Sequence, residues 1–232
     1  MAGAFKDNGA FIHYRASESS DKKIEGDGLF LLDTGGQYME GTTDTTRTIL
    51  VGKANLLMIE DYTLVIKGHI ALSQAIFPYG TKGRELDPLA RKSLWSRGKD
   101  YAHGTGHGVG CFLSVHEGPI SISKNSESLI KSGMLISNEP GYYKNGEYGI
   151  RIENLEIVTE KYFKNNKETY LCLENITRVP IELNLIDKEK LSEDEISWIN
   201  DYHDKVYQDL SQLVDNTNIE LLDFLKIKTL HI

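Results

Sequence analysis

The sequence has few cysteines, no long apolar run and fewer basic than acidic residues. Cys111 and Cys172 stand far apart, and neither belongs to a C-x-x-C pair, so a disulfide framework and a cysteine metal site are not indicated. No stretch approaches the roughly 20 apolar residues that span a bilayer, and the first residues lack the apolar core of a secretion signal. We therefore expect a soluble, cytoplasmic protein in a reducing compartment.

The charge balance argues against nucleic acid as a partner. The chain has 26 Lys and Arg against 34 Asp and Glu, a formal net charge of -8. A nucleic-acid binder needs a basic surface, whereas bound cations would offset part of this negative charge. The 232 residues suit one large domain, and length alone leaves two small domains open.

Apolar periodicity predicts an α+β fold. Helical spacing predicts helices over 54–76 and 87–96, the second with Pro88 near its first turn. After Pro180 an S-x-x-E capping box at 192–195 opens an amphipathic helix through Leu213, followed by a break at 215–218 and a short helix over 219–225. Short apolar runs predict strands over 28–33, 47–51, 110–115, 134–139, 148–158 and 169–173.

The sequence does contain a set of potential ligands for hard metal ions: Asp33, Asp44, His107, Glu139 and Glu153. Each sits in a glycine- or threonine-rich patch or at the end of an apolar run. Four carboxylates and one imidazole, with no thiolate, suit Mn, Co, Fe or Zn in a hydrolytic role rather than a structural zinc. Two ions about 3.5 to 4 Å apart need bridging carboxylates, terminal ligands and an open position, and this set fills that inventory.

Several of these residues also have a purely structural interpretation. An aspartate after a strand is usually a turn or capping residue. Adjacent antiparallel strands easily bring two carboxylates together, but Asp33 and Asp44 gain weight only through the other members of the set. Arg151 and Glu153 would share one face of a strand, where an exposed pair contributes under about 1 kcal/mol.

The histidine motifs exclude two other kinds of site. His103 and His107 lie in H-G-T-G-H-G-V-G, which does not satisfy G-x-G-x-x-G, and no Walker lysine follows, so a phosphate site is disfavoured. His116 begins H-E-G-P and lacks the second histidine of H-E-x-x-H, which disfavours a zincin.

Taken together, the motifs resemble those of aminopeptidase P, the Xaa-Pro aminopeptidase of peptidase family M24. The resemblance rests on D-T-G-G-Q-Y, G-T-T-D-T-T-R-T, H-G-T-G-H-G-V-G, V-H-E-G-P, N-E-P-G-Y-Y and G-I-R-I-E-N, in that order, and L-E-N-I-T-R-V-P-I with W-I-N-D-Y-H is similar to the large cytosolic branch. It implies the pita-bread fold, in which two pseudo-symmetric halves enclose a dinuclear site. Residues 1–180 would form a partial catalytic domain, and 181–232 a C-terminal helical segment of the same domain.

The resemblance also implies how the metal ions are held. Asp33 would bind one ion, Asp44 and Glu153 would bridge both, and His107 with Glu139 would complete the other. Two divalent ions are expected, Mn²⁺ first, with Co²⁺, Zn²⁺ and Fe²⁺ open. A water between them would attack the peptide, because metal binding lowers the pKa of water from about 15.7 towards about 7.

The implied substrate is a peptide with proline in second position, cleaved before that proline. By similarity, Glu139 handles the proton of the water, and His103 and His116 bind the scissile carbonyl. His13, in G-A-F-I-H-Y, matches a substrate-pocket histidine, and a partly buried strand residue is the equal alternative. Arg151 would orient Glu153.

The chain departs from the family near its start, because only 32 residues precede Asp33. We expect it to be N-terminally truncated and to expose apolar surface, which favours instability or association. A homodimer or a complementary N-terminal fragment is then an expected partner. The alternatives are an Xaa-Pro dipeptidase, a methionine aminopeptidase-like hydrolase, and a catalytically impaired fragment or pita-bread binding module.

Overall fold

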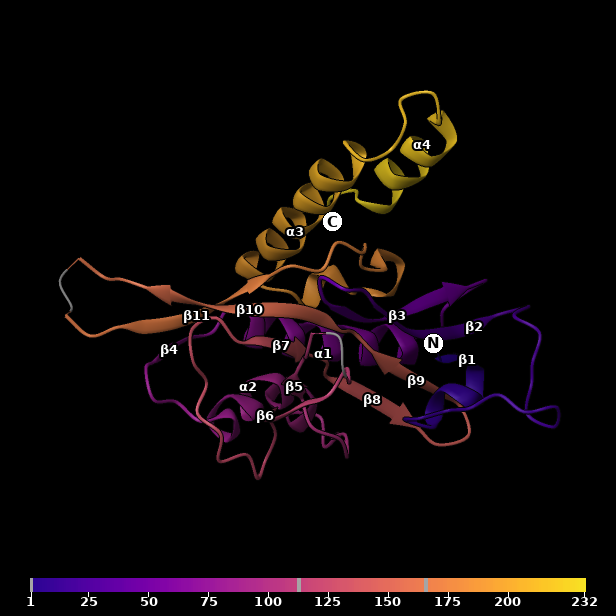
Figure 1. Ribbon diagram of the computed structural model, residues 1–232. Coiled ribbons are helices and arrows are strands. Elements are labelled where there is room, and N and C mark those ends of the chain that lie inside the picture. The colour runs from indigo at the N-terminus through magenta and orange to yellow at the C-terminus, as the bar shows by residue number, and fades with distance from the viewer. Residues whose placement is uncertain (1, 112–113, 165–166) are drawn as a thin grey trace.

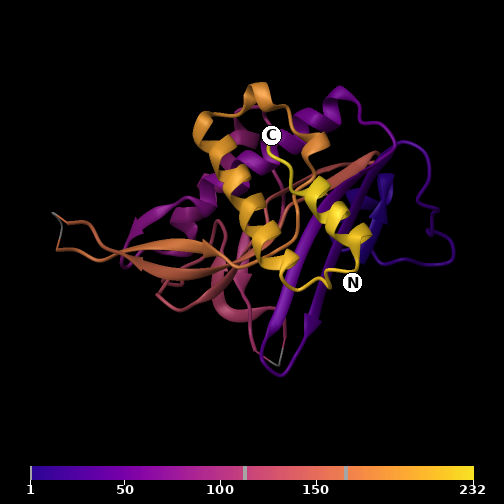
Figure 2. The same cartoon turned by 90° about the horizontal axis from the view of Figure 1, so that it is seen from above.

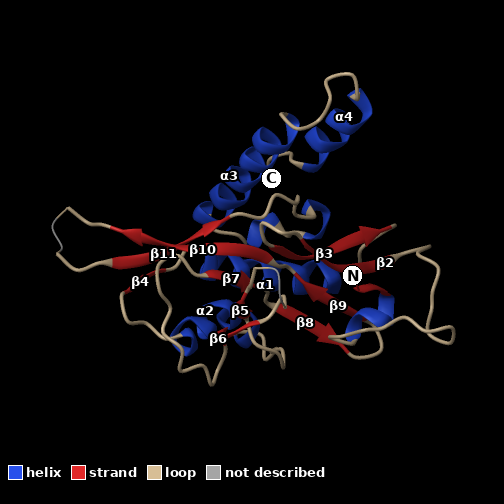
Figure 3. Cartoon of the chain, viewed as in Figure 1, coloured by secondary structure: helices blue, strands red, loops and turns tan. Residues whose placement is uncertain are grey.

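The computed structural model describes residues 2–111, 114–164 and 167–232. Its strands form a three-stranded sheet β1-β2-β3, a six-stranded sheet β4-β11-β10-β7-β5-β6 and a hairpin β8-β9, all with antiparallel pairing (Figures 1 and 3). The strands are β1 (Ala2–Phe5), β2 (Gly28–Gln37), β3 (Thr42–Val51), β4 (Ile76–Pro78), β5 (Gly106–Gly108), β6 (Glu117–Ile122), β7 (Leu135–Asn138), β8 (Gly141–Lys144), β9 (Tyr148–Arg151), β10 (Asn154–Lys161) and β11 (Tyr170–Asn175). The helices are η1 (Lys6–Ala10), α1 (Leu56–Ser73), α2 (Gly83–Trp95), η2 (Leu183–Leu185), η3 (Lys188–Lys190), α3 (Glu193–Ser211) and α4 (Ile219–Lys228).

The β2–β3 hairpin is longer than the apolar runs predict. The two strands pair without a break from Gly28 with Val51 to Gln37 with Thr42. The threonine-rich segment is therefore strand rather than turn, because β-branched threonines suit a paired, half-buried strand. Gly35 pairs with Asp44, so Asp33 lies diagonally across from Asp44 on the same face of the hairpin.

Helix α1 is the central element of the fold. Its first turn is capped by Asn55, whose side chain accepts a hydrogen bond of 2.9 Å from Met58 N. Apolar side chains are buried around most of it, as expected of a helix surrounded by other elements. The predicted end was three residues too late, because Ile76 leaves the helix to pair with Cys172 of β11.

Helix α2 begins four residues before the predicted start, which places Pro88 inside the helix. The start was missed because the residue at the N-cap is Lys82 rather than Ser, Thr, Asp or Asn. Glu85 Oε2 accepts a hydrogen bond of 2.7 Å from Lys82 N. Leu86, Ala90 and other apolar residues of α2 pack with α1 against the six-stranded sheet.

Two strand predictions were wrong. Gly110, Cys111 and the segment 114–115 are not in a strand, because they connect β5 to β6; residues 112 and 113 lie outside the described residues. The segment 148–158 is two strands, since Ile152 and Glu153 leave the ladder: Glu153 N donates to Thr46 O of β3 at 3.0 Å. The chain thus passes from the hairpin β8-β9 into the large sheet at this point.

The C-terminal helices lie together on one side of the sheets (Figures 1 and 2). The predicted capping box is confirmed, with Ser192 Oγ accepting from Glu195 N and Glu195 Oε2 accepting from Ser192 N. Ile199 and Val206 join the core cluster of α1, whereas Leu213 lies past the end of α3 and is 81% exposed. The C-terminal segment therefore shares a hydrophobic core with the rest of the chain.

Candidate metal centre

Asp33 and Asp44 enter the site from the β2–β3 hairpin. Asp44 is buried, and Asp33 accepts a 2.7 Å ion-paired hydrogen bond from Arg151 Nη2. Their diagonal positions on adjacent antiparallel strands bring both carboxylates to one pocket, as the sequence predicted.

His107 and Glu139 enter the site from the six-stranded sheet. His107 lies on β5, and its Nε2 is 3.6 Å from Asp44 Oδ2 and 3.4 Å from Glu139 Oε1. Its Nδ1 lies 2.9 Å from Gly108 O, which can only accept, so Nδ1 carries the proton and Nε2 presents a lone pair to the carboxylates. Glu139 follows β7 directly, and Ser137 Oγ donates to its Oε1 at 3.2 Å.

Glu153 completes the set from the bend between β9 and β10. Thr46 Oγ1 donates to Glu153 Oε2 at 2.6 Å. Ligand atoms of Asp44, His107 and Glu153 all lie within 4.8 Å of one another. Every donor of the predicted set thus lines one pocket of about 390 Å³.

The electrostatics of this pocket favour a bound cation. Burial, reinforced by the neighbouring carboxylates, raises the pKa of Asp44 to about 6 and that of Glu139 to about 8, and it raises the pKa of Glu153 as well. Burial lowers the pKa of His107, which keeps its ring neutral and able to coordinate. An oxygen-rich set of crowded carboxylates with a neutral imidazole fits divalent metal ions.

The three other predicted histidines line the same pocket. His103 Nδ1 donates to Gly104 O at 2.7 Å, so its Nε2 accepts from Tyr143 OH at 2.9 Å, and burial lowers its pKa to about 4. The ring of His116 meets that of His107 edge to face, with centroids 4.2 Å apart. His13 is exposed in a turn after η1, so the interpretation as a partly buried strand residue was wrong.

Arg151 links the carboxylates to their surroundings. Its guanidinium donates to Asp33, to Tyr143 OH at 2.8 Å and to Thr46 Oγ1 at 3.1 Å, and the side chain is 4% exposed. Thr46 in turn donates to Glu153, so Arg151 reaches Glu153 through that hydroxyl. The alternative of an exposed Arg151–Glu153 surface pair was wrong, because both residues are buried.

Thr46, Ser137 and Tyr143 also form hydrogen bonds in the site, and the sequence did not single them out. Thr46 lies two residues after Asp44, and Ser137 two before Glu139, so each shares a strand face with a proposed ligand. That two-residue spacing was the available signal for both. Tyr143 belongs to the N-E-P-G-Y-Y motif, but only tertiary structure brings it to His103.

The fold and the site define a candidate metal centre whose donors are mostly carboxylate oxygens. The chain belongs to metallopeptidase family M24: residues 3–160 match that family, and 169–232 match the C-terminal region of peptidase M24.

Curated relatives are similar to most of this chain. A probable Xaa-Pro aminopeptidase P of Coprinopsis cinerea is 47% identical over 228 residues, covering 96% of this chain and 36% of that protein. The Xaa-Pro aminopeptidase 1 of Dictyostelium discoideum is 47% identical over 214 residues, covering 91% of this chain and 34% of that protein. The chain thus spans about a third of the length of the curated relatives it matches.

The solved structures confirm the pita-bread fold. The X-prolyl aminopeptidase of Caenorhabditis elegans, described as a cytosolic enzyme with a di-nuclear active site, matches 100% of this chain with a TM-score of 0.95 and 38% identity, over 38% of its own length. A prolidase from Pyrococcus furiosus matches 76% of this chain and 48% of that chain, with a TM-score of 0.66 and 34% identity. In the described residues, no helix is long and apolar enough to cross a membrane.

Proposed function

We propose that this chain carries the catalytic site of a metal-dependent aminopeptidase that removes the N-terminal residue from peptides with proline in second position. The observation that supports this most is the meeting of four carboxylates and one neutral imidazole in one pocket of a family M24 chain. The C. elegans neighbour, an X-prolyl aminopeptidase, matches the chain with a TM-score of 0.95 against 0.66 for the prolidase. A dipeptidase is therefore the less favoured alternative.

The proposed metal ligands are Asp33, Asp44, His107, Glu139 and Glu153. Two divalent ions held there would supply a water of lowered pKa as nucleophile. Among possible metals we propose Mn²⁺, because carboxylate oxygens are the majority of the donors.

The remaining polar groups bind the peptide and move its protons. Glu139 takes up the proton of the attacking water on a carboxylate oxygen, a role supported by its place in the pocket, 3.4 Å from His107 Nε2. His116, whose ring contacts that of His107, binds the scissile carbonyl, and His103 and His13 contact the peptide along the same pocket wall. Arg151 holds Asp33 directly and Glu153 through Thr46.

We extend the proposal to the organisation of the protein. Residues 1–180 and 181–232 form one domain, which is supported by the core that α3 shares with α1. A cytoplasmic location is supported by the description of the C. elegans neighbour as cytosolic. Association into a homodimer or with a complementary N-terminal fragment stays a prediction.

The test is hydrolysis of an Xaa-Pro-Xaa tripeptide with saturating Mn²⁺, compared with an Xaa-Pro dipeptide. We expect cleavage before proline in the tripeptide, and loss of that activity in Asp44→Ala and in His107→Ala. Matched controls are Asp201→Ala and His231→Ala, which remove an exposed aspartate and an exposed histidine far along the C-terminal segment. No turnover by the unaltered chain would refute the proposed activity, whereas full activity in Asp44→Ala and His107→Ala would refute the proposed ligands.

A further inference from the structure

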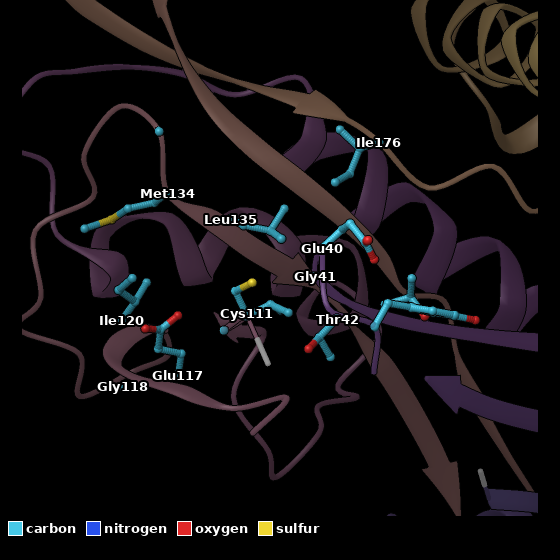
Figure 4. A pocket seen from close by; sticks show the side chains of 15 residues that line it. Glu40, Gly41, Thr42, Cys111, Glu117, Gly118, Ile120, Met134, Leu135 and Ile176 are labelled. Carbon is cyan, nitrogen blue, oxygen red and sulfur yellow. The ribbon is translucent and has the colours of Figure 1, made fainter. Parts of the chain in front are cut away.

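Arg47 of β3 contacts the main chain of the proposed metal ligand Glu153. Alternate residues of a strand share a face, so Thr42, Asp44 and Thr46 point to one side of β3. Thr42 lines a surface cleft of about 710 Å³ (Figure 4), and Asp44 lines the metal pocket. Thr46 donates to the carboxylate of Glu153. Arg47 therefore points to the other side of the strand, where it is only 5% exposed.

One end of the Arg47 guanidinium holds the peptide groups that fix Glu153. Its Nη1 donates to Glu153 O at 2.7 Å and to Thr46 O at 2.9 Å. Thr46 O also accepts a hydrogen bond of 3.0 Å from Glu153 N. The N–H, the C=O and the carboxylate of Glu153 are therefore all bonded to Thr46 or Arg47. The position of this proposed ligand thus depends on two neighbouring residues of β3.

The other end of the guanidinium reaches the C-terminal part of the chain. Its Nε donates to Pro180 O at 3.0 Å, and its Nη2 lies 2.7 Å from Val179 O and 2.9 Å from the hydroxyl oxygen of Tyr202 on α3. That hydroxyl donates to Val179 O at 2.7 Å, so it accepts from Arg47. Arg47 thus joins the region that matches the C-terminal part of peptidase M24, which contains α3, to the region that contains Glu153.

The partners of Arg47 suit orientation better than stabilisation. Nη2 also bonds Asn154 Oδ1 at 2.7 Å, and in the described part of the chain all hydrogen bonds of Arg47 end on neutral oxygens. A buried cation without a carboxylate partner loses hydration free energy that neutral acceptors offset only in part, so an apolar side chain would stabilise the fold as well. A planar guanidinium, however, fixes the directions of several carbonyl groups at once. By contrast, Arg151, which lines the metal pocket, is ion-paired with Asp33.

We propose that Arg47 is a positioning residue through which the docking of α3 holds Glu153 in its metal-binding geometry. This inference rests on the proposed metal centre. Without the hydroxyl of Tyr202, the guanidinium loses a partner that keeps it turned toward Glu153 O. The Glu153 peptide group then gains freedom to move, which weakens metal binding by its carboxylate. Replacing a residue that orients a metal ligand typically changes metal affinity by about 10- to 100-fold.

The first experiment measures the Kd of Mn²⁺ for the folded 232-residue chain by titration calorimetry. We expect Arg47→Lys to raise this Kd by about 10- to 100-fold, because a single ammonium does not bond both sets of carbonyls at once. Tyr202→Phe keeps the ring stacked on Trp198 and removes only the hydroxyl. For that variant we expect a rise of about two- to tenfold, the usual range for one hydrogen bond.

Arg178 provides the matched control for the arginine substitution. It also ties the sheet region to α3, through an ion pair with Asp209, but among the described residues it makes no hydrogen bond or ion pair with Glu153. We expect Arg178→Lys to leave the Kd of Mn²⁺ unchanged. Tyr207→Phe, which removes a hydroxyl from an exposed side chain of α3, is the control for the tyrosine substitution.

A double-mutant comparison tests whether Tyr202 acts through Arg47. In the Arg47→Met chain, we expect Tyr202→Phe to leave the Kd of Mn²⁺ unchanged, because the side chain that transmits its effect is gone. Circular dichroism checks that each variant is folded, and Arg47→Lys takes the place of Arg47→Met if the latter unfolds the chain.

Hydrogen exchange of the Glu153 amide provides a measurement on the metal-free chain. That N–H is bonded to Thr46 O, which also accepts from Arg47. We expect Arg47→Lys and Tyr202→Phe to speed its exchange by about threefold or more, because local opening becomes easier. Arg178→Lys leaves the exchange rate of this amide unchanged.

The outcomes separate this inference from the proposed function. No binding of Mn²⁺ by the unaltered chain refutes the proposed metal centre, and with it both the function and this inference. Mn²⁺ binding and cleavage before proline that are unchanged in Arg47→Lys and Tyr202→Phe refute the positioning role alone. An equal rise of the Kd in Arg178→Lys assigns the effect to general loosening of α3, and so also overturns the proposal.

Discussion

Carboxyl groups lie on both sides of the large sheet near β7 and β10, and their surroundings differ between the two sides. On the metal-centre side, Glu139 directly follows β7 and lies next to His107. Glu153 directly precedes β10 and lies near Asp44 and His107. Toward α1, Glu156 is fully buried among amides, and its Oε1 accepts from Asn138 at 3.4 Å and from Asn175 at 3.5 Å.

Burial raises the pKa of the carboxyl group on both sides, but only one side gathers several carboxylates. Burial raises the pKa of Glu156 to about 7, even though hydrogen bonds from Ser73 and the two amides lower it. For Glu139 and Glu153, like charges add to the effect of burial. A raised pKa therefore does not identify a metal ligand by itself; convergence with an imidazole on one pocket does.

The largest expected effect comes from exchanging one carboxylate for an amide on each side. Glu153→Gln is expected to lower Mn²⁺-dependent kcat/KM by roughly 10³-fold or more, because a neutral amide would hold a divalent ion less well than the proposed carboxylate ligand. Glu156→Gln, the matched change on the helix side, stays within about threefold. Equal losses in the two variants, measured with one tripeptide, would remove the distinction between the sides.

The next effect concerns stability against pH. Glu156 has a pKa of about 7 in the folded chain against 4.5 otherwise, so the folded state holds its proton longer and stability falls as pH rises from about 4.5 to about 7. The total loss is about 3 kcal/mol, complete above pH 7. Glu156→Gln has no such proton, and urea unfolding at pH 4 and pH 8 measures the difference. We expect the free energy of unfolding of the variant to rise relative to that of the parent chain only at pH 8. An equal difference between the two chains at both pH values would contradict the raised pKa of Glu156.

The smallest expected effect tests how the metal side is held together. In Arg151→Lys, a single ammonium group replaces a guanidinium that donates hydrogen bonds to Asp33, Tyr143 and Thr46 at once. We expect kcat/KM to fall about 10- to 100-fold, with a higher Mn²⁺ concentration needed for half-maximal activity. Arg97→Lys, at an exposed position of the chain, is the control. An unchanged metal requirement would show that Arg151 does not position the ligands.

Much of the fold follows from local pattern. The periodicity of α1 and the capping box of α3 predict those helices because both signals lie within a few residues of chain. The predictions fail where pairing with a distant strand decides the outcome. Ile76 leaves α1 to pair with β11, and Glu153 leaves the ladder to bond β3, and neither contact has a signature in neighbouring residues.

By itself, the sequence determined the donor types, their order and the family, because motif letters carry chemical identity. The tertiary structure decided which atoms meet: the Nε2 of His107 faces two carboxylates because Nδ1 is bonded to Gly108. It also decided that Thr46 joins Arg151 to Glu153. These arrangements depend on strand register and on side chains far apart along the chain, so the physical reason lies in long-range packing rather than in local sequence.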